Sequence, residues 1–234
     1  MRTLGIVGGI GPESTIEYYR AILGAVRDRY GETTAPPIII NSIDVHKVLR
    51  LAGAGDLGAL ASYLAQELGR LARAGADAAI MAANTPHVVF DDLVSRCSIP
   101  LISIVEATAD VAERQGLTRL GLLGTRSTME GQFFPDVFAK HGMAIVAPNS
   151  SERAYVHEKY TSELVHNVFS PETRMGMCRL IELMKGRDRI DGVILGGTEL
   201  PLLLRDRTYA GIPLLDTTAI HAAATVDHLW PATS

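Results

Sequence analysis

Four segments of the chain combine glycines with hydroxyl and amide side chains, a composition suited to holding a small anion. Backbone N–H groups at glycine turns, backed by helix dipoles, bind anions well, and threonine hydroxyls add further donors. The segments are Gly8–Thr15, Asn84–His87, Gly124–Thr128 and Gly197–Glu199. The side chains that we expect to contact substrate are Asn84, Thr85, Thr125, Thr128, Thr198 and Glu199. Because the turns form two related pairs, they indicate a substrate with two carboxylates, or with one carboxylate and another acidic group.

A nucleotide is a less suitable ligand for the first of these turns. The dinucleotide fingerprint requires three glycines, and Gly9-Ile10-Gly11-Pro12-Glu13-Ser14 lacks the third. The chain also has no phosphate-binding loop of the G-x-x-x-x-G-K-[ST] type. A tight turn in which Pro12 begins a helix explains the glycines adequately. We therefore predict no nucleotide and no other cofactor.

Three ionisable residues near these segments are weak candidates for a catalytic group: His87, Glu199 and Lys159. His87 follows Asn84 by three residues, and it could act as a general base or could equally orient its own loop. Lys159 lies in a helical stretch where a lysine is more often solvated than catalytic. The other histidines have no partner at a spacing typical of metal ligands, so we predict no metal site.

Composition restricts the class of protein. The 234 residues are 47% hydrophobic, which is enough for one large domain or two small ones, each with its own core. The formal net charge is −4 and the chain has no basic cluster, which argues against nucleic acid as a partner. No apolar run approaches the roughly 18 to 20 residues of a membrane span. The first residues read directly into a strand without a signal-peptide pattern, so we expect a cytoplasmic location. With only Cys97 and Cys178, a disulfide framework is not expected.

Short apolar runs alternate with helical patterns along the whole chain. This alternation predicts a parallel sheet with helical crossovers, and the continuous apolar runs indicate strands covered on both faces. The predicted strands are Leu4–Val7, Pro37–Ser42, Ala78–Ala82, Leu101–Ile102, Leu120–Leu123, Ala144–Val146, Gly192–Leu195 and Leu214–Leu215. The predicted helices include Glu13–Arg29, Leu57–Ala74, Ile104–Gln115, Pro171–Met184 and a final helix from Thr217 to about Leu229.

The order of these elements repeats. Leu4-Gly5-Ile6-Val7-Gly8 resembles Leu120-Gly121-Leu122-Leu123-Gly124, and the segment 76–85 echoes the segment 190–199 at similar spacing. Two matches in the same order indicate an internal duplication. We therefore predict two similar doubly wound α/β lobes, related by a pseudo-twofold axis, with a ligand cleft between them. The expected bounds are 1–104 with 210–234 for the first lobe and 105–209 for the second.

The same segments resemble the aspartate/glutamate racemase family. The resemblance is carried across the chain, in the family's order, by Gly5–Gly9 with Gly11–Thr15, Asn84–His87, Leu123–Arg126, Gly196–Leu200 and Asp216–Thr218. Family members are two-lobed proteins, often homodimers, that work without pyridoxal phosphate or metal. Their chemistry removes the proton next to a carboxylate and returns it on the opposite face, which requires two flanking bases.

The resemblance has one break. The family places a cysteine just before the Asn-Thr of the first lobe and another just before the Thr-Glu of the second. Ala83 and Gly197 occupy these positions here, and neither side chain can carry a proton. The polar residues around them match the family, so the resemblance implies the fold and the binding loops without the two-thiol racemisation.

Three functions follow as hypotheses. The first is a cofactor-independent enzyme that acts on a small carboxylate or amino acid at the inter-lobe cleft by isomerase, lyase or decarboxylase chemistry. The second is racemisation by bases other than thiols. The third is a binding protein that kept the site and lost the chemistry. Fold resemblance alone does not decide among them.

Overall fold

The computed structural model describes residues 1–31 and 33–231. The chain divides into two compact units: unit 1 comprises 1–104 and 221–234, and unit 2 comprises 105–220. The bounds expected from the sequence, 1–104 with 210–234 and 105–209, differ from these units in residues 210–220. Residues 210–220 belong to unit 2 because the strand they contain pairs with that unit's sheet rather than returning to unit 1.

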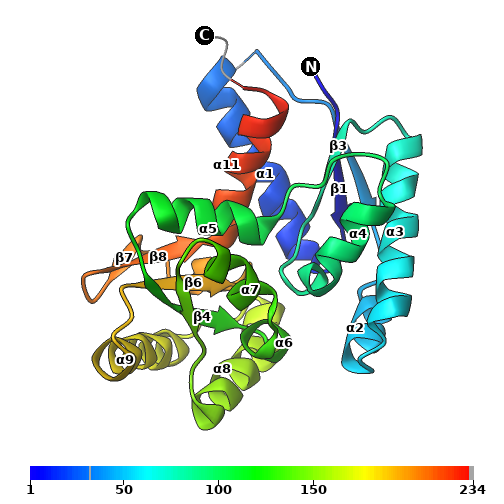
Figure 1. Cartoon of the computed structure of the whole chain (residues 1–234). Coiled ribbons are helices and arrows are strands. Elements are labelled where there is room, and N and C mark those ends of the chain that lie inside the picture. Colours follow the sequence, from blue (N-terminus) through cyan, green and yellow to red (C-terminus); the bar gives the residue numbers. More distant parts are fainter. Residues whose placement is uncertain (32, 232–234) are drawn as a thin grey trace. The chain divides into compact units, whose positions relative to one another are not determined.

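Unit 1 contains a three-stranded parallel sheet in the order β2-β1-β3 (Figure 1). Its strands are β1 (Leu4–Gly8), β2 (Ile38–Ser42) and β3 (Ala78–Met81). Its helices are α1 (Pro12–Tyr30), α2 (Val45–Gly53), α3 (Leu57–Arg73), η1 (Thr85–Val89), α4 (Phe90–Arg96) and the later part of α11 (Thr217–Leu229). The predicted strand Leu101–Ile102 forms only a single bridge, between Ala79 and Leu101.

Alternation of side chains along β1 gives unit 1 two cores. Leu4 and Ile6 pack with α1 and with the apolar face of α11, including Val226. Val7 packs on the other face against α3, through residues such as Leu64. Figure 1 shows α1 and α3 on opposite sides of β1. The doubly covered sheet explains why each strand reads as a continuous apolar run.

Unit 2 contains a five-stranded sheet in the order β5-β4-β6-β8-β7. Its strands are β4 (Arg119–Gly124), β5 (Ala144–Val146), β6 (Gly192–Gly196), β7 (Thr208–Tyr209) and β8 (Ile212–Asp216). Its helices are α5 (Ile104–Arg114), α6 (Arg126–Glu130), α7 (Phe133–Lys140), α8 (Ser150–Ser162), η2 (Leu164–His166), α9 (Pro171–Asp188) and α10 (Leu200–Leu203). The short β7 pairs antiparallel with β8, an exception to the parallel sheet that the sequence predicted.

Several short elements of unit 2 have clear local causes. Asn149 and Glu152 form a reciprocal capping box that begins α8. Ser170 accepts the N–H of Thr173, and Pro171 occupies the first turn of α9, where its missing N–H costs nothing. These caps begin two helices whose apolar residues include Val156 and Met177, and both pack into the core of unit 2.

The two units share the arrangement of their first three strands. The order β2-β1-β3 of unit 1 corresponds to β5-β4-β6 of unit 2. A local contact is repeated as well: Asp77 accepts the N–H of Thr3 at 2.6 Å, and Asp191 accepts the N–H of Thr118 at 2.7 Å. A shared strand order and a shared side-chain contact support the internal duplication that the sequence indicates.

Candidate functional site at the strand ends

The carboxyl ends of β4 and β6 lie together in unit 2, because the two strands pair in parallel with Gly124 opposite Gly196. A Cβ on Gly124 would stand 2.7 Å from the Gly196 carbonyl oxygen and 3.1 Å from the Thr128 Cβ. Both glycines are therefore required by the close approach of the two strands and the fully buried Thr128. This packing sets the positions of the two loops that follow.

The loop after β4 uses its hydroxyls to begin a helix. Thr125 caps α6, and its Oγ1 accepts the N–H of Thr128 at 3.3 Å. The two hydroxyl oxygens are also 3.1 Å apart, so one donates to the other. Thr125 is half-buried, whereas Thr128 is fully buried. Of the two predicted substrate contacts, Thr125 is the one that solvent reaches.

The loop after β6 has an unexpected neighbour, Tyr160 of α8. A Cβ on Gly197 would stand 2.5 Å from the Tyr160 hydroxyl oxygen and 2.6 Å from its Cε2 atom. The phenol therefore occupies the space that any side chain at position 197 would need. Gly197 has no side chain, and the Tyr160 hydroxyl stands where one would lie.

Tyr160 also contacts the other polar residues of this loop. Its hydroxyl donates to Glu199 Oε2, and the Thr198 hydroxyl donates to the same oxygen at 2.9 Å. Tyr160 and Glu199 are 6% and 7% exposed, so the pair is shielded from water. Burial, followed by the negative charge of Glu199, raises the pKa of Tyr160 well above its ordinary value. Tyr160 therefore carries its proton at neutral pH.

A third polar group lies beyond the end of β8, beside β6 in the same sheet. The Thr218 hydroxyl is buried and has no hydrogen-bond partner among the described residues. A buried hydroxyl without a partner costs about 1–3 kcal/mol, so it is a place where a ligand atom would be stabilised. Thr218 belongs to the Asp216–Thr218 segment, which carried part of the family resemblance.

Lys159, a catalytic candidate from the sequence, is adjacent to Tyr160 in α8 but has a different environment. Its ammonium is 2.7 Å from Glu163 and 3.6 Å from Glu158. Hydrogen bonding to Glu163 raises the pKa of Lys159, so the side chain is held as a cation in an ion-pair group of the helix itself. The contacts favour a structural role for this lysine.

In unit 1 the turn after β1 satisfies its own backbone. Gly9 has a φ of +80°, and a Cβ there would stand 2.6 Å from the Ile43 carbonyl oxygen, so only glycine fits. Its N–H donates to the Thr15 hydroxyl at 2.9 Å, and that hydroxyl donates to Gly11 at 3.2 Å. This N–H is thus used within the turn, which reduces the capacity for anions that the sequence predicted.

The loop after β3 carries the other predicted substrate contacts. Asn84 is 5% exposed, and Thr85 is half-buried at the start of η1. Ala83, which precedes Asn84, is also half-buried. Asn84 and Thr85 have amide and hydroxyl side chains, so they can orient a carboxylate and cannot take up its neighbouring proton.

His87 is held by backbone atoms on both sides of its ring. The Ile104 N–H donates to Nε2 at 3.3 Å, so Nδ1 carries the proton and donates to the Ala83 carbonyl at 3.0 Å. Burial, followed by the nearby His221, lowers the pKa of His87 to about 3. With both nitrogens engaged and the ring 2% exposed, the geometry favours the loop-orienting role over the general base.

The two cysteines pack in the apolar cores of their own units. Cys178 belongs to α9 and is buried in the core of unit 2 with residues such as Met177. Cys97 follows α4 and packs, half-buried, against the α3 core of unit 1.

One cluster of potential metal ligands lies within the described ranges. The ligand atoms of Asp110, Glu113 and His141 lie within 4.8 Å of one another. Asp110 and Glu113 are exposed, and His141 is paired with Glu113 at 3.0 Å and with Glu106 at 3.5 Å. These ion pairs account for the cluster without a metal, and they raise the pKa of His141.

No helix among the described residues is long and apolar enough to cross a membrane.

Comparison with known proteins agrees with this arrangement. A solved structure from Yersinia pestis, described as a candidate Asp/Glu racemase, is 36% identical, with a TM-score of 0.90 and coverage of 98% of this chain and 99% of that one. An aspartate racemase homologue from Pyrococcus horikoshii is 31% identical, with a TM-score of 0.85 and coverage of 98% and 99%. The broad specificity amino-acid racemase RacX of Bacillus subtilis is 22% identical over 95% of this chain and 96% of its own.

The family model for Asp/Glu/Hydantoin racemases matches residues 7–225, a range that includes all of the strand-end loops described above. The duplicated strand order, the paired glycines of β4 and β6, and the match over nearly the whole chain lead to the same conclusion. This chain belongs to the Asp/Glu/Hydantoin racemase family.

Proposed function

We propose that the protein is a cofactor-independent enzyme that acts on a small carboxylate or amino acid by one-proton isomerase or lyase chemistry. The observation that carries this proposal is the Tyr160 hydroxyl, which occupies the side-chain space of Gly197 and donates to Glu199. A phenol with a raised pKa holds its proton until a stronger base forms beside it. A carbanion next to a carboxylate is such a base.

The residues of the first-unit loop support a single proton carrier rather than two. Racemisation needs a base on each face of the substrate carbon. Ala83 has no proton to exchange, and Asn84 and Thr85 do not titrate near neutral pH. His87 is neutral and bonded to the backbone through both nitrogens. The pair Tyr160–Glu199 in unit 2 is therefore the group to which we assign proton transfer.

In the lyase form, the bond between the substrate carbon and one carboxylate breaks and carbon dioxide leaves. The electron pair remains on the carbon, delocalised into the remaining carboxylate. Tyr160 donates its proton to that carbon, and solvent water later restores the phenol. In the isomerase form the Glu199 carboxylate removes a proton from one substrate carbon, and the electron pair moves through the double bond to another carbon. Tyr160 donates its proton to that second carbon, and the proton held by Glu199 then passes to the phenolate. Thr125 and Thr218 would hold the carboxylate oxygens.

The test is proton exchange and turnover in deuterated water. The substrates are aspartate, glutamate, simple dicarboxylates and 2-substituted malonates, followed by NMR for deuterium at carbon and for loss of a carboxyl group. We expect turnover with at least one dicarboxylate, and a loss of about a hundredfold or more in kcat for Tyr160→Phe. Tyr155→Phe is the matched control, because Tyr155 lies on α8 and its hydroxyl packs against Gly176.

Full kcat in the Tyr160→Phe variant would remove the phenol from the mechanism. Exchange of the α-proton of aspartate or glutamate together with loss of optical rotation would favour the second function, racemisation by non-thiol bases. Saturable thermal stabilisation by dicarboxylates without any turnover would favour the third, a binding protein.

A further inference from the structure

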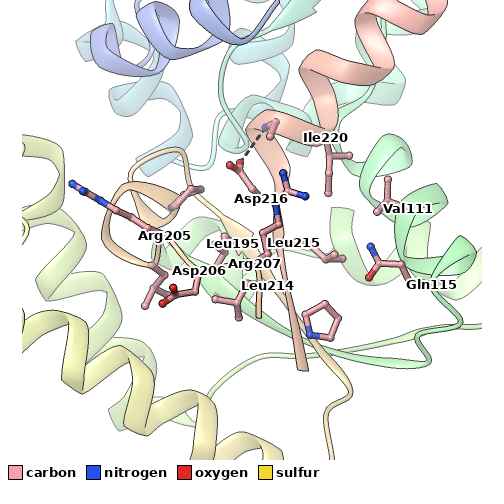
Figure 2. Close-up of a pocket in the computed structure, with 14 residues that line it drawn as sticks. Val111, Gln115, Leu195, Arg205, Asp206, Arg207, Leu214, Leu215, Asp216 and Ile220 are labelled. Carbon is pink, nitrogen blue, oxygen red and sulfur yellow. Dashed lines mark hydrogen bonds between the residues drawn. The ribbon is translucent and has the colours of Figure 1, made fainter. Parts of the chain in front are cut away.

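A concave site lies in unit 2, beside β8 (Figure 2). It has a volume of about 390 Å³, within the roughly 300–1,000 Å³ of small-molecule sites. It is surrounded by the last turn of α5 and the residue after it, by α10 and the loop that follows, by β8, and by the first turn of α11. Because β7 is only two residues long, it leaves the carboxyl half of β8 without a strand on its outer side.

The floor of this pocket is apolar and already buried in the protein. Leu195, Leu204, Leu214 and Leu215 line it, and each is at most 7% exposed. An apolar group placed over them would leave water without disturbing the core. This floor fits a hydrocarbon body.

The charged residues that the structure describes at the rim differ in how they are paired. Asp206 is 2.6 Å from Arg174, and Asp216 Oδ1 accepts the N–H groups of Thr218 and Ala219 at 2.9 and 3.0 Å. Arg205 donates to a backbone carbonyl, and Figure 2 shows its side chain extending away from the other lining residues. Arg207 makes no side-chain hydrogen bond or ion pair with any residue that the structure describes.

We propose that this pocket binds a small monocarboxylate with an apolar body, such as a medium-chain fatty acid or an arylalkanoate. Its carboxylate would pair with the Arg207 guanidinium, a planar fork that matches the two oxygens. Figure 2 shows the Gln115 side chain directed from α5 toward the pocket, so its amide would add a donor. The hydrocarbon would cover the leucine floor. This proposal does not depend on the function assigned to Tyr160.

The pocket also lies next to the loop that carries Glu199. Leu195 is the residue before Gly196 in β6, and Leu204 follows α10, the helix that begins at Leu200. A ligand on the leucine floor therefore contacts the residues on both sides of the Gly197–Glu199 loop. We expect its binding to change the temperature at which unit 2 unfolds.

Calorimetry and thermal melts with hexanoate and 3-phenylpropanoate test the site. Acetate supplies the charge without the body, and hexanol supplies the body without the charge. We expect saturable binding of the two long carboxylates, weakened about tenfold by Arg207→Gln and by replacing hexanoate with hexanol. Arg73→Gln, which removes an exposed arginine in unit 1, is the control and leaves the affinity unchanged.

Val111→Trp fills the pocket from α5 and should abolish binding. If Val111→Trp does not fold, Arg207→Gln still tests the site, because Arg207 is exposed. The proposal fails if neither long carboxylate binds up to about 10 mM. It also fails if Arg207→Gln binds as tightly as the wild type. Loss of binding in Tyr160→Phe with retention in Arg207→Gln would assign the ligand to the strand-end site instead.

Discussion

Adding one methyl group at position 197 tests the packing on which the assignment of Tyr160 rests. In Gly197→Ala the new Cβ would stand 2.5, 2.6 and 2.8 Å from the Oη, Cε2 and Cζ atoms of Tyr160. Favourable contacts between carbon atoms lie near 3.5–4.0 Å, so the overlap is about 1 Å. Tyr160 is buried and bonded to Glu199, so it cannot move without losing that contact.

The expected cost has two parts. Overpacking a core typically costs about 1–3 kcal/mol. A hydrogen bond to a charged group contributes about 1.5–3 kcal/mol, so weakening the bond from the phenol to the Glu199 carboxylate adds a cost of up to about 3 kcal/mol. Because the two effects relax together, we expect Gly197→Ala to lower the free energy of unfolding by about 2–4 kcal/mol, a decrease of roughly 5–15 °C in Tm for a chain of this length.

Thermal melts and urea titrations of four proteins measure this effect: the wild type, Gly197→Ala, Tyr160→Ala and the double variant. Removing the ring gives the new methyl group space, so the cost of Gly197→Ala should largely vanish in the Tyr160→Ala background. Gly186→Ala is the control, because a Cβ there meets nothing within 4 Å and should stabilise α9 slightly. A Gly197→Ala protein that melts within about 1 °C of the wild type, or a cost that persists without the ring, would refute this account of the packing.

Three further predictions concern buried and titrating groups. Thr218→Val removes a hydroxyl that has no partner among the described residues. The free energy of unfolding without ligand, measured by urea titration, should therefore stay the same or rise by up to about 1 kcal/mol, and the affinity for dicarboxylates, measured by calorimetry, should fall. Hydrogen bonding to Glu113 raises the pKa of His141 in the folded protein, so the stabilisation by protonated His141 is complete below about pH 6.5 and is lost as the pH rises through the folded-state pKa. The difference in Tm between His141→Gln and the wild type should therefore be larger at pH 6 than at pH 9. The pKa of His87 is lowered to about 3 in the folded protein, so between about pH 3 and pH 6.5 this histidine binds a proton only when the protein unfolds. The stability present above about pH 6.5 is therefore lost as the pH falls. The urea midpoint should decrease between pH 7.5 and pH 5, and the decrease should be smaller for His87→Asn than for the wild type.

The α/β class and its duplication could be predicted from the sequence because they depend on local patterns. Continuous apolar runs such as Leu4–Val7 mark strands covered on both faces, and β1 is present within one residue of that prediction. The final helix was predicted with its bounds, Thr217–Leu229, and its later part packs in unit 1 as expected. The short edge strand β7 was missed because two residues carry no periodicity.

The candidate site was less accessible to sequence reasoning. Tyr160 is 39 residues from Glu199, on a helix whose pattern is not amphipathic enough to show which face it buries. The neighbouring Lys159 was therefore the residue of α8 predicted from the sequence, and its contacts are ion pairs within its own helix. The one available signal was Gly197 itself, since a glycine after a buried strand indicates a close approach by another group.

The sequence by itself determined where the strands end and which small polar residues follow them, because strand length, glycine turns and helix caps are set by residues that are neighbours along the chain. Only the tertiary structure decided what fills the space beside Gly197 and whether His87 can accept a proton. Both depend on burial and on partners from distant segments, and those determine how a titratable group behaves.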